Sequence, residues 1–420
     1  MSAFSTTRKF AGVVAAAAAI SLALAGCSAS SEPAAKGDGV LKIGAVIPLT
    51  GALAFLSPPE IAGLELAVED INAAGGVLGK PVEFSIEDSS DGDNPTVAPA
   101  SATKLISEGA DAILGAAASG VTRLIIDQIT QAKVVEISMS NTAVDLTTWN
   151  DGGFYYRTAP SDLLQGAIVG NQIVADGNEN VGIIYQQTSY GEGLEAKAKA
   201  VIEGAGAKVV SSLPFPENET NFDTIVDQTL AAGADSILVI SYDEIKKIVP
   251  ALQKKKFDGS KIYLVDGNLA NFSEESWKGY LKGAQGTLPG GKTDEAFKKR
   301  ASELYKKNHG EELTEFAYLA ESYDAVILLA LAAQEAGDDS GASIQAHMTS
   351  VSTGGTKVTN FADGLKVITD GGDVDFDGFS GPIEFDENGD PTGASIGIWQ
   401  YVDGSGISVL KNVVAGNSVK

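Results

Sequence analysis

One stretch of the chain has the residue types and spacing of a phosphate-binding loop. Residues 286–293 read GTLPGGKT, which satisfies the pattern G-x-x-x-x-G-K-[ST] with Gly286, Gly291, Lys292 and Thr293. Such a loop holds nucleotide phosphates when a buried strand precedes it and a largely buried helix follows it. Here YLKGAQG precedes it and the heavily charged TDEAFKKRASELYKKN follows. These flanks predict a glycine-rich connection and no nucleotide site.

Two further motifs match chemistry that their flanks do not support. DVDFDGFSGPIE, Asp373–Glu384, meets every required position of a calcium loop, but a glycine pair precedes it and a strand and a turn follow, so an adventitious calcium site remains only an alternative. GASIG has the spacing of a nucleophile elbow around Ser395, which needs a following helix and a downstream histidine. The only histidines, His309 and His347, lie upstream. We therefore expect no catalytic residue, no metal, no cofactor and no enzymatic activity.

A cluster of hydroxyl and amide side chains follows two apolar segments in the first third of the chain. Ser119 and Gly120 stand before the helix-like VTRLIIDQITQ, and the segment SMSNT supplies Ser140, Asn141 and Thr142 after the apolar VVEI. Free backbone amides at a helix start attract a carboxylate, and hydroxyl donors add to that attraction. The alternatives are a plain helix cap at Ser119 and an Asx- or Ser/Thr-turn at residues 140–142.

A second set of candidates follows apolar segments of the middle third. Tyr190 lies in SYGEG, Tyr242 follows ILVIS, and Asp266 follows IYLV. Ligands of open α/β sheets bind at the carboxyl ends of strands, where these residues are expected. Asp266 is suited to pair with an ammonium group, with Asn268 as a rival position, and the two tyrosines have packing as their alternative role.

The elements that position these residues alternate between strand and helix. VLKIGAVIPL at 40–49 and PVEFSIED at 81–88 have strand patterns, and 58–74 has the 3.6-residue apolar period of a helix ending at a glycine pair. SEGADAILGAA and LAAGADSILVIS are near copies, which suggests two lobes of one architecture, with a common helix-to-strand turn as the alternative. The alternation predicts parallel sheets covered by helices on both faces.

The first 39 residues predict export and lipid anchoring. Arg8 and Lys9 precede an uncharged, alanine-rich run of residues 10–26, which is the layout of a secretory signal peptide. The run ends in LAGC, which resembles a bacterial lipobox and makes Cys27, the chain's single cysteine, the expected lipidation site. Residues 27–39 are expected to form a flexible tether. The remaining body is expected outside the cytoplasm, anchored to the outer face of the cell membrane.

The strongly negative net charge of the chain limits the classes of molecule that it can bind. The sequence has 30 basic and 55 acidic residues in 420 and a formal net charge of -25. Removing residues 1–26 takes away two basic residues and no acid, which makes the charge -27. A surface this acidic repels nucleic acid, and it favours a net-neutral zwitterion over a dicarboxylate or a phosphate.

A collinear series of segments resembles the branched-chain amino-acid (Leu/Ile/Val) binding family of ABC transporter receptors, which are type I periplasmic binding proteins. The resemblance covers residues 40 to about 408. Its segments are VEDINAAGGVLGKPVEFSIEDSSDGDNP, ILGAAASGVT, ISMSNTAVDLT, FYYRTAPSD, SYGEGL and FSGPIEFDENGD.

The resemblance implies an α/β fold of two Rossmann-like lobes joined by a hinge of three crossovers, with the ligand between the lobes. Lobe 1 would comprise 40–157 and 288–380, and lobe 2 would comprise 158–287 and 381–415. The crossovers would lie near 157–159, 286–288 and 381–383.

The resemblance also implies a function without catalysis. Residues that match Ser119, Ser140, Asn141 and Thr142 hold the ligand's carboxylate and amino group in that family. The closed receptor, a monomer, would dock on ABC permease subunits whose ATPase is a separate chain. A ligand-sensing ectodomain of the same fold and a secreted hydrolase are the alternatives.

The loop after the first strand departs from the family. GALAFLSPPE lacks the usual small residues and glycines. Its Phe55 and Leu56 are expected to line a side-chain pocket, so the resemblance leaves the ligand open among amino acids and related small carboxylates or amides.

Overall fold

The computed structural model describes residues 37–291 and 293–417. The expected signal peptide, the lipidation site Cys27 and most of the expected tether lie outside the described residues, as does Lys292 of the GTLPGGKT segment.

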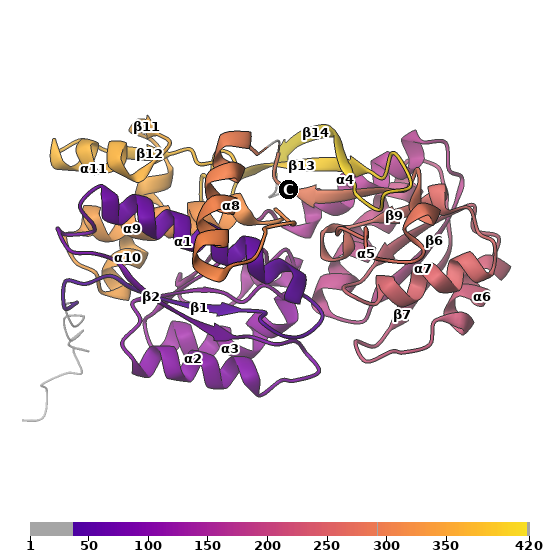
Figure 1. Ribbon diagram of the computed structural model, residues 1–420, viewed down its shortest axis with the longest axis horizontal. Helices are drawn as coiled ribbons and strands as arrows, with labels where there is room; N and C mark the ends of the chain where they lie inside the picture. Colours follow the sequence, from indigo (N-terminus) through magenta and orange to yellow (C-terminus); the bar gives the residue numbers. More distant parts are fainter. Residues whose placement is uncertain (1–36, 292, 418–420) are drawn as a thin grey trace, which may run out of the picture. The chain divides into compact units, whose positions relative to one another are not determined.

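The first sheet has five parallel strands in the order β2-β1-β3-β4-β5. Helices α2 and α3 cover one face, whereas α1 and α9 cover the other (Figure 1). The strands are mostly buried because helices lie on both faces, as expected for a parallel sheet. The bounds are β1 Lys42–Ile47, α1 Ser57–Ala73, β2 Glu83–Asp88, α2 Val97–Ser107, β3 Ala112–Gly115, α3 Ser119–Gln131, β4 Val135–Ser138, β5 Tyr155–Arg157 and α9 Leu319–Ala336.

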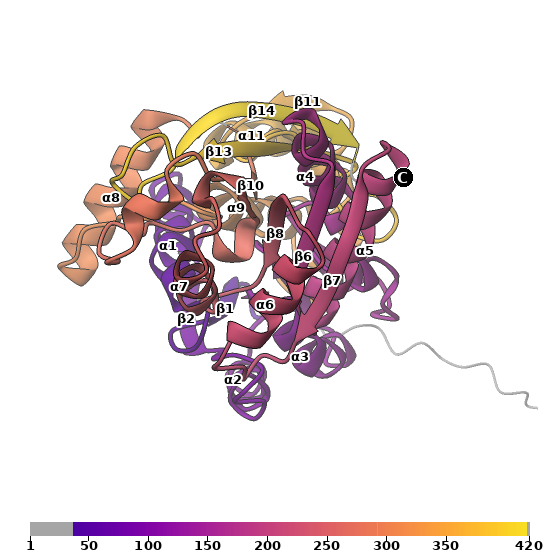
Figure 2. The ribbon, with the colours of Figure 1, turned by 90° about the vertical axis from the view of Figure 1, so that its right-hand side faces the viewer.

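The second sheet has seven strands in the order β14-β13-β10-β9-β8-β6-β7. Helices α4 and α5 pack on one face and α6 and α7 on the other (Figure 2). Strands β6 to β10 are parallel, but β13 pairs antiparallel with both β10 and β14 at one edge. The sheet is therefore mixed, whereas the sequence pattern predicts a wholly parallel sheet. The bounds are α4 Asp162–Ala175, β6 Asn180–Gln186, α5 Ser189–Gly204, β7 Lys208–Phe215, α6 Asp223–Ala231, β8 Ser236–Ile240, α7 Ile245–Lys254, β9 Ile262–Leu264, β10 Gln285–Pro289, β13 Gly393–Gln400 and β14 Val409–Asn417.

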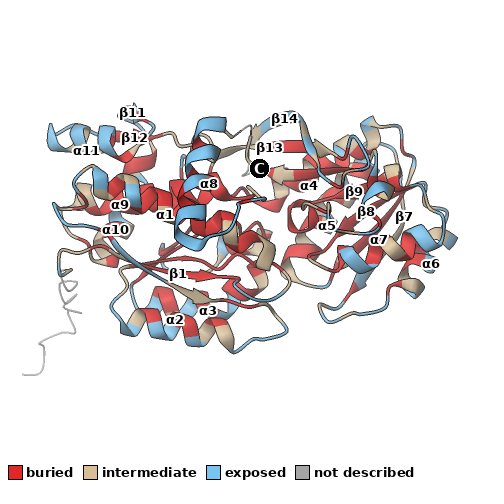
Figure 3. Cartoon of the chain, in the orientation of Figure 1, coloured by how far each residue is buried: buried red, intermediate tan, exposed pale blue. Residues whose placement is uncertain are grey.

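The remaining elements extend the first lobe. Helix α9 is buried along most of its length because α1, α10 and α11 pack around it (Figure 3). Helix α8 packs on α1 and exposes its charged face. The bounds are α8 Glu295–His309, α10 Gly341–His347, β11 Thr356–Val358, α11 Phe361–Thr369 and β12 Val374–Phe376.

The chain passes between the two sheets three times: between β5 and α4, between β10 and α8, and between β12 and β13. This confirms the fold class of two α/β lobes joined by three crossovers. The residue limits assigned to each lobe stay a prediction.

A buried ion pair joins the first passage to the third. Arg157, the last residue of β5, donates from Nε and Nη2 to the two carboxylate oxygens of Asp390, both at 2.6 Å. Its Nη1 donates to the carbonyl of Ala143 at 2.8 Å. Burial opposes the charge of Arg157, but Asp390 outweighs that effect and holds the pKa of Arg157 above its usual value. The sequence analysis did not find this pair.

The three motifs lie in other structural contexts than the sites they resemble. The glycine-rich connection expected at 286–293 is only partly correct, because residues 286–289 belong to the mostly buried strand β10 and the connection to α8 begins after Pro289; the first half of the motif is therefore strand and not a phosphate-binding loop. Ser395 lies within strand β13 and not at a strand-to-helix turn. In the calcium-like segment, Lys357 Nζ pairs with Asp375 at 3.2 Å and with Asp377 at 2.9 Å.

Candidate functional site

A small cavity lies where strands of both sheets end. Only about 10 Å³ of it can hold the centre of a water molecule, which is room for about one water in this structure. The first lobe contributes residues after β3 and β4, and the second contributes residues after β6, β8 and β9. This is the expected position for a ligand in open α/β sheets. The lining residues are Leu53, Leu56, Ala117, Ser119, Ser140, Thr142, Tyr190, Tyr242, Asp266, Gly267 and Tyr318.

On the first-lobe side, Ser119 joins a helix start to the neighbouring loop. It is the first residue of α3, and the N-cap is Ala118, which makes no side-chain cap. The Ser119 hydroxyl oxygen accepts from the backbone N–H groups of Thr142 at 3.4 Å and Ala143 at 3.3 Å. The plain-cap alternative for Ser119 is therefore wrong. In the first turn of α3, the N–H groups of Val121 and Thr122 donate to the Ala118 carbonyl, both at 3.0 Å, and Ser119 is the residue of this turn that lines the cavity.

The SMSNT segment is held by hydrogen bonds to other parts of the first lobe. Ser140 Oγ donates to Glu60 Oε1 at 2.9 Å. Asn141 Nδ2 donates to the carbonyls of Ala116 at 3.0 Å and Ala117 at 2.8 Å. These bonds span more than twenty residues in sequence. The Ser/Thr-turn considered as the alternative is present as well, because Ser138 Oγ accepts from the backbone N–H groups of Ser140 at 3.3 Å and Asn141 at 3.0 Å. The fully buried Asn141 fixes the loop behind Ser140, whereas Ser140 itself lines the cavity.

On the second-lobe side, three donors hold the carboxylate of Asp266. Its Oδ1 accepts from Tyr190 Oη at 2.8 Å and from Gln165 Nε2 at 2.9 Å, and its Oδ2 accepts from Tyr318 Oη at 2.6 Å. Burial raises the pKa of Asp266, while these hydrogen bonds act in the opposite direction. The rival Asn268 is engaged elsewhere, because its amide donates to the Val239 carbonyl at 2.8 Å.

The two predicted tyrosines form a stacked pair beside Asp266. The rings of Tyr190 and Tyr242 lie 5.3 Å apart with an interplanar angle of 15°. Gly267 permits this arrangement, since a Cβ there would lie 2.8 Å from Tyr242 Cδ1 and 2.9 Å from Tyr190 Oη. The pair both packs and lines the cavity, so the two roles considered for these tyrosines are compatible.

A second buried acid, Asp162, lies next to the cavity lining. It is the first residue of α4, and neither carboxylate oxygen has a hydrogen-bond partner that meets normal geometry among the described residues. Burial raises its pKa well above the usual value, and the nearby charge of Asp266 raises it further. The Thr142 hydroxyl is close enough to oppose part of that rise. The site therefore places two buried acids close together, and each favours the neutral form of the other.

The structure brings together six of the nine predicted ligand-binding residues. They are Ser119, Ser140, Thr142, Tyr190, Tyr242 and Asp266. Gly120, Asn141 and Phe55 do not line the cavity, and their roles in binding stay predictions.

The loop after β1 presents leucines to the cavity in place of Phe55. Ala54–Leu56 form a 3₁₀ turn, in which residues three apart share a face. Leu53 and Leu56 therefore line the cavity together, as Leu56 was expected to, while Phe55 packs against the core.

Tyr318 also lines the cavity and was not predicted; it has a left-handed backbone with φ of 61° immediately before α9. Its distance of 52 residues from Asp266 left no local signal for their contact.

Two other properties bear on function. Within residues 37–291 and 293–417, no group of three or more metal-ligating side chains is placed to hold a metal ion. None of the described helices is both long enough and apolar enough to cross a bilayer.

Comparison with known proteins agrees with this geometry. The sequence model of the family described as periplasmic binding protein matches residues 40–394. A relative, Leu/Ile/Val-binding protein homolog 3 from Brucella melitensis, is 25% identical over 367 residues, which are 87% of this chain and 92% of that protein.

Two solved structures share the fold. One is the branched-chain amino acid transporter substrate binding protein LivJ from Streptococcus pneumoniae in complex with isoleucine (TM-score 0.72, 23% identity, 90% of this chain and 99% of that one). The other is an ABC transporter solute binding protein from R. palustris in complex with 4-hydroxybenzoate (TM-score 0.72, 17% identity, 90% of this chain and 97% of that one).

Proposed function

Because this chain belongs to the periplasmic binding protein family, we propose that it captures a small aliphatic α-amino acid, without catalysis, in the cavity between its two lobes. In this proposal it is the lipid-anchored substrate-binding subunit of an ABC importer. It presents its closed, loaded form to separate permease subunits.

The observation that carries the proposal is that one side of the small cavity has hydrogen-bond donors for a carboxylate and the other side has a carboxylate for an ammonium group. The start of α3 and the Ser119 and Thr142 region offer N–H and O–H groups to a carboxylate. Across the cavity, Asp266 offers a fixed carboxylate to an ammonium group. A zwitterion satisfies both sides and brings no net charge into a buried site.

The remaining lining selects an aliphatic side chain of modest size. Leu53 and Leu56 supply apolar surface, and the stacked Tyr190 and Tyr242 supply a flat wall. The lining is tight, with room for about one water molecule in this structure, and this favours a small ligand.

The same lining argues against an aromatic carboxylate such as the 4-hydroxybenzoate of the R. palustris protein. No lysine or arginine lines the cavity among the described residues, and Asp266 faces it. The nearby Arg157 is already paired with Asp390. A ligand with a carboxylate and no cation would therefore meet two acids, Asp266 and Asp162, without a basic partner.

The test is thermal unfolding of the purified protein with a panel that separates these ligand classes. L-leucine, L-isoleucine, L-valine, L-alanine, L-glutamate and 4-hydroxybenzoate are each added at 1 mM. A ligand that binds only the native state raises the midpoint, by an amount that grows with the ratio of its concentration to Kd. We expect shifts with the aliphatic amino acids. A shift with 4-hydroxybenzoate alone would contradict the proposed ligand class.

The two hydroxyl residues provide the site-specific control. Ser119→Ala and Thr142→Ala are each expected to reduce the shift given by the amino acid. If neither variant reduces it, the ligand's carboxylate is not held where we propose.

A further inference from the structure

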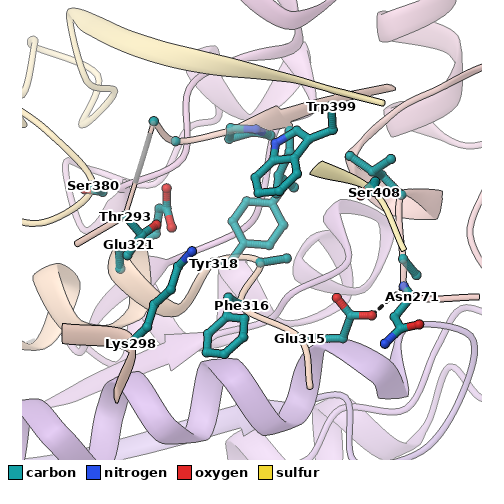
Figure 4. Close-up of a pocket in the computed structure, with 18 of the residues that line it drawn as sticks. Asn271, Thr293, Lys298, Glu315, Phe316, Tyr318, Glu321, Ser380, Trp399 and Ser408 are labelled. Carbon is teal, nitrogen blue, oxygen red and sulfur yellow. Dashed lines mark hydrogen bonds between the residues drawn. The ribbon is translucent and has the colours of Figure 1, made fainter. Parts of the chain in front are cut away.

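A second, larger cavity lies beside the second passage between the lobes. It has about 220 Å³ of space that the centre of a water molecule can occupy, and it opens between the end of β10, the start of α9 and the β13–β14 edge (Figure 4). Residues of both lobes line it, since Trp399 belongs to β13 of the second sheet, whereas Phe316 precedes α9 and Glu321 lies in its first turn. The proposed function above makes no use of this cavity.

Aromatic side chains form much of its wall. Phe316, Phe379, Trp399 and the ring of Tyr318 all line it, and they come from three separate segments of the chain. Figure 4 shows the rings of Phe316, Tyr318 and Trp399 around one space. Such walls bind flat apolar groups by stacking and edge contacts.

One basic and one acidic side chain enter this space without pairing with each other. Among the described residues, Lys298 has an ion pair only with the exposed Glu295, at 3.5 Å, and its ammonium lies 5.3 Å from the centre of the Phe316 ring. The buried Glu321 carboxyl makes no hydrogen bond to another described residue. Figure 4 shows Lys298 and Glu321 directed into the cavity beside Tyr318. An exposed pair such as Lys298–Glu295 is weak, so the ammonium is available to a ligand.

We propose that this cavity is a second binding site for a zwitterionic amino acid with an aromatic side chain. Lys298 binds the ligand's carboxylate, Glu321 binds its ammonium group, and the aromatic walls hold its ring. Neither end of this ligand is left without a counter-charge, which makes a zwitterion a better occupant than an aromatic acid or an amine alone.

The protonation of Glu321 gives this proposal an independent signature. Burial raises the pKa of Glu321 to about 8, and the charge of Asp324 contributes to the rise. Glu315, whose carboxylate accepts from the Asn271 N–H at 2.5 Å, also lines the cavity, with a pKa raised by burial to about 7. An ammonium bound at Glu321 favours its ionised form, so binding at pH 7 should release a proton.

The experiment is isothermal titration of the purified protein with L-tryptophan, an amino acid with a large aromatic ring. Titrations at pH 7 in two buffers of different ionisation enthalpy measure the proton release. We expect Lys298→Met to weaken tryptophan binding about tenfold, as for a lost hydrogen bond to a charged group. Glu321→Gln should weaken binding similarly and abolish the proton release. Lys299→Met, at a neighbouring exposed lysine, is the matched control and should change neither.

Three results would overturn the proposal: no heat of binding with tryptophan at 10 mM, unchanged affinity in both Lys298→Met and Glu321→Gln, or loss of tryptophan binding in the Ser119→Ala, Thr142→Ala double variant. The last would place tryptophan in the smaller cavity. Because that double variant and the aliphatic amino acids probe the smaller cavity separately, failure of the second site is distinguishable from failure of the proposed function.

Discussion

Replacement of Asp266 by asparagine isolates the charge that we assign to the ligand's ammonium group. The amide has the same shape, so its oxygen can keep the hydrogen bonds from Tyr190 and Gln165. Its nitrogen can donate to the Tyr318 hydroxyl, which rotates to accept. The variant should therefore fold. It loses a hydrogen bond between charged groups, worth about 1.5–3 kcal/mol, which corresponds to a roughly 10- to 150-fold increase in Kd.

The assay is isothermal titration with L-leucine at pH 7.5, with thermal unfolding as the check on folding. Glu203→Gln is the matched control, because it removes one negative charge from an exposed position of α5 in the same lobe. The control should bind L-leucine as the wild type does. If Asp266→Asn also binds within twofold of the wild type while remaining folded, Asp266 does not hold the ammonium group and the assignment is refuted.

Three further changes test other features of the structure. Gly267→Ala should displace the stacked tyrosines and weaken L-leucine binding about tenfold; unchanged affinity would show that the stack is unimportant. Glu60 has a pKa raised by burial from 4.5 to about 8, so its burial reduces stability as pH rises through that window. The free energy of unfolding of Glu60→Gln, measured in urea relative to the wild type, should therefore rise by roughly 3–5 kcal/mol between pH 5 and pH 9. A difference that does not change with pH would contradict this. Asp390→Asn should cost about 3–5 kcal/mol in the same assay, because it leaves Arg157 buried without its counter-charge; a loss below about 1 kcal/mol would show that the guanidinium finds another partner.

The fold was predictable because its signals are local. The apolar period of residues 58–74 corresponds to α1, which begins at Ser57 and ends at Ala73. The short apolar runs before Ser119 and after Gln131 correspond to β3 and β4. The antiparallel edge of the second sheet was not predicted, since strand direction depends on how the chain returns after its third passage and not on residue pattern.

The candidate site was predictable only where its residues follow strands. Asp266 and the two tyrosines follow β9, β6 and β8, so strand position alone located them. Tyr318 approaches Asp266 from the start of a helix in the other lobe, and only the tertiary fold brings them together. Phe55 was expected to line the pocket, but Leu53 does so together with Leu56 because the loop forms a 3₁₀ turn. The three-residue period of this turn differs too little from the period of the following α-helix to be recognised in sequence.

The Arg157–Asp390 pair has a mechanical consequence for the way the lobes move. It links the first and third passages between the lobes to each other and to the Ala143 carbonyl. These two segments must therefore move together. The remaining connection, from Gly290 to Asp294, has no such ion pair among its described residues, although the Gly290 N–H donates to the Ser395 carbonyl of β13 at 2.8 Å. Backbone torsion on opening should therefore concentrate after Gly290, in the short segment that leads into α8.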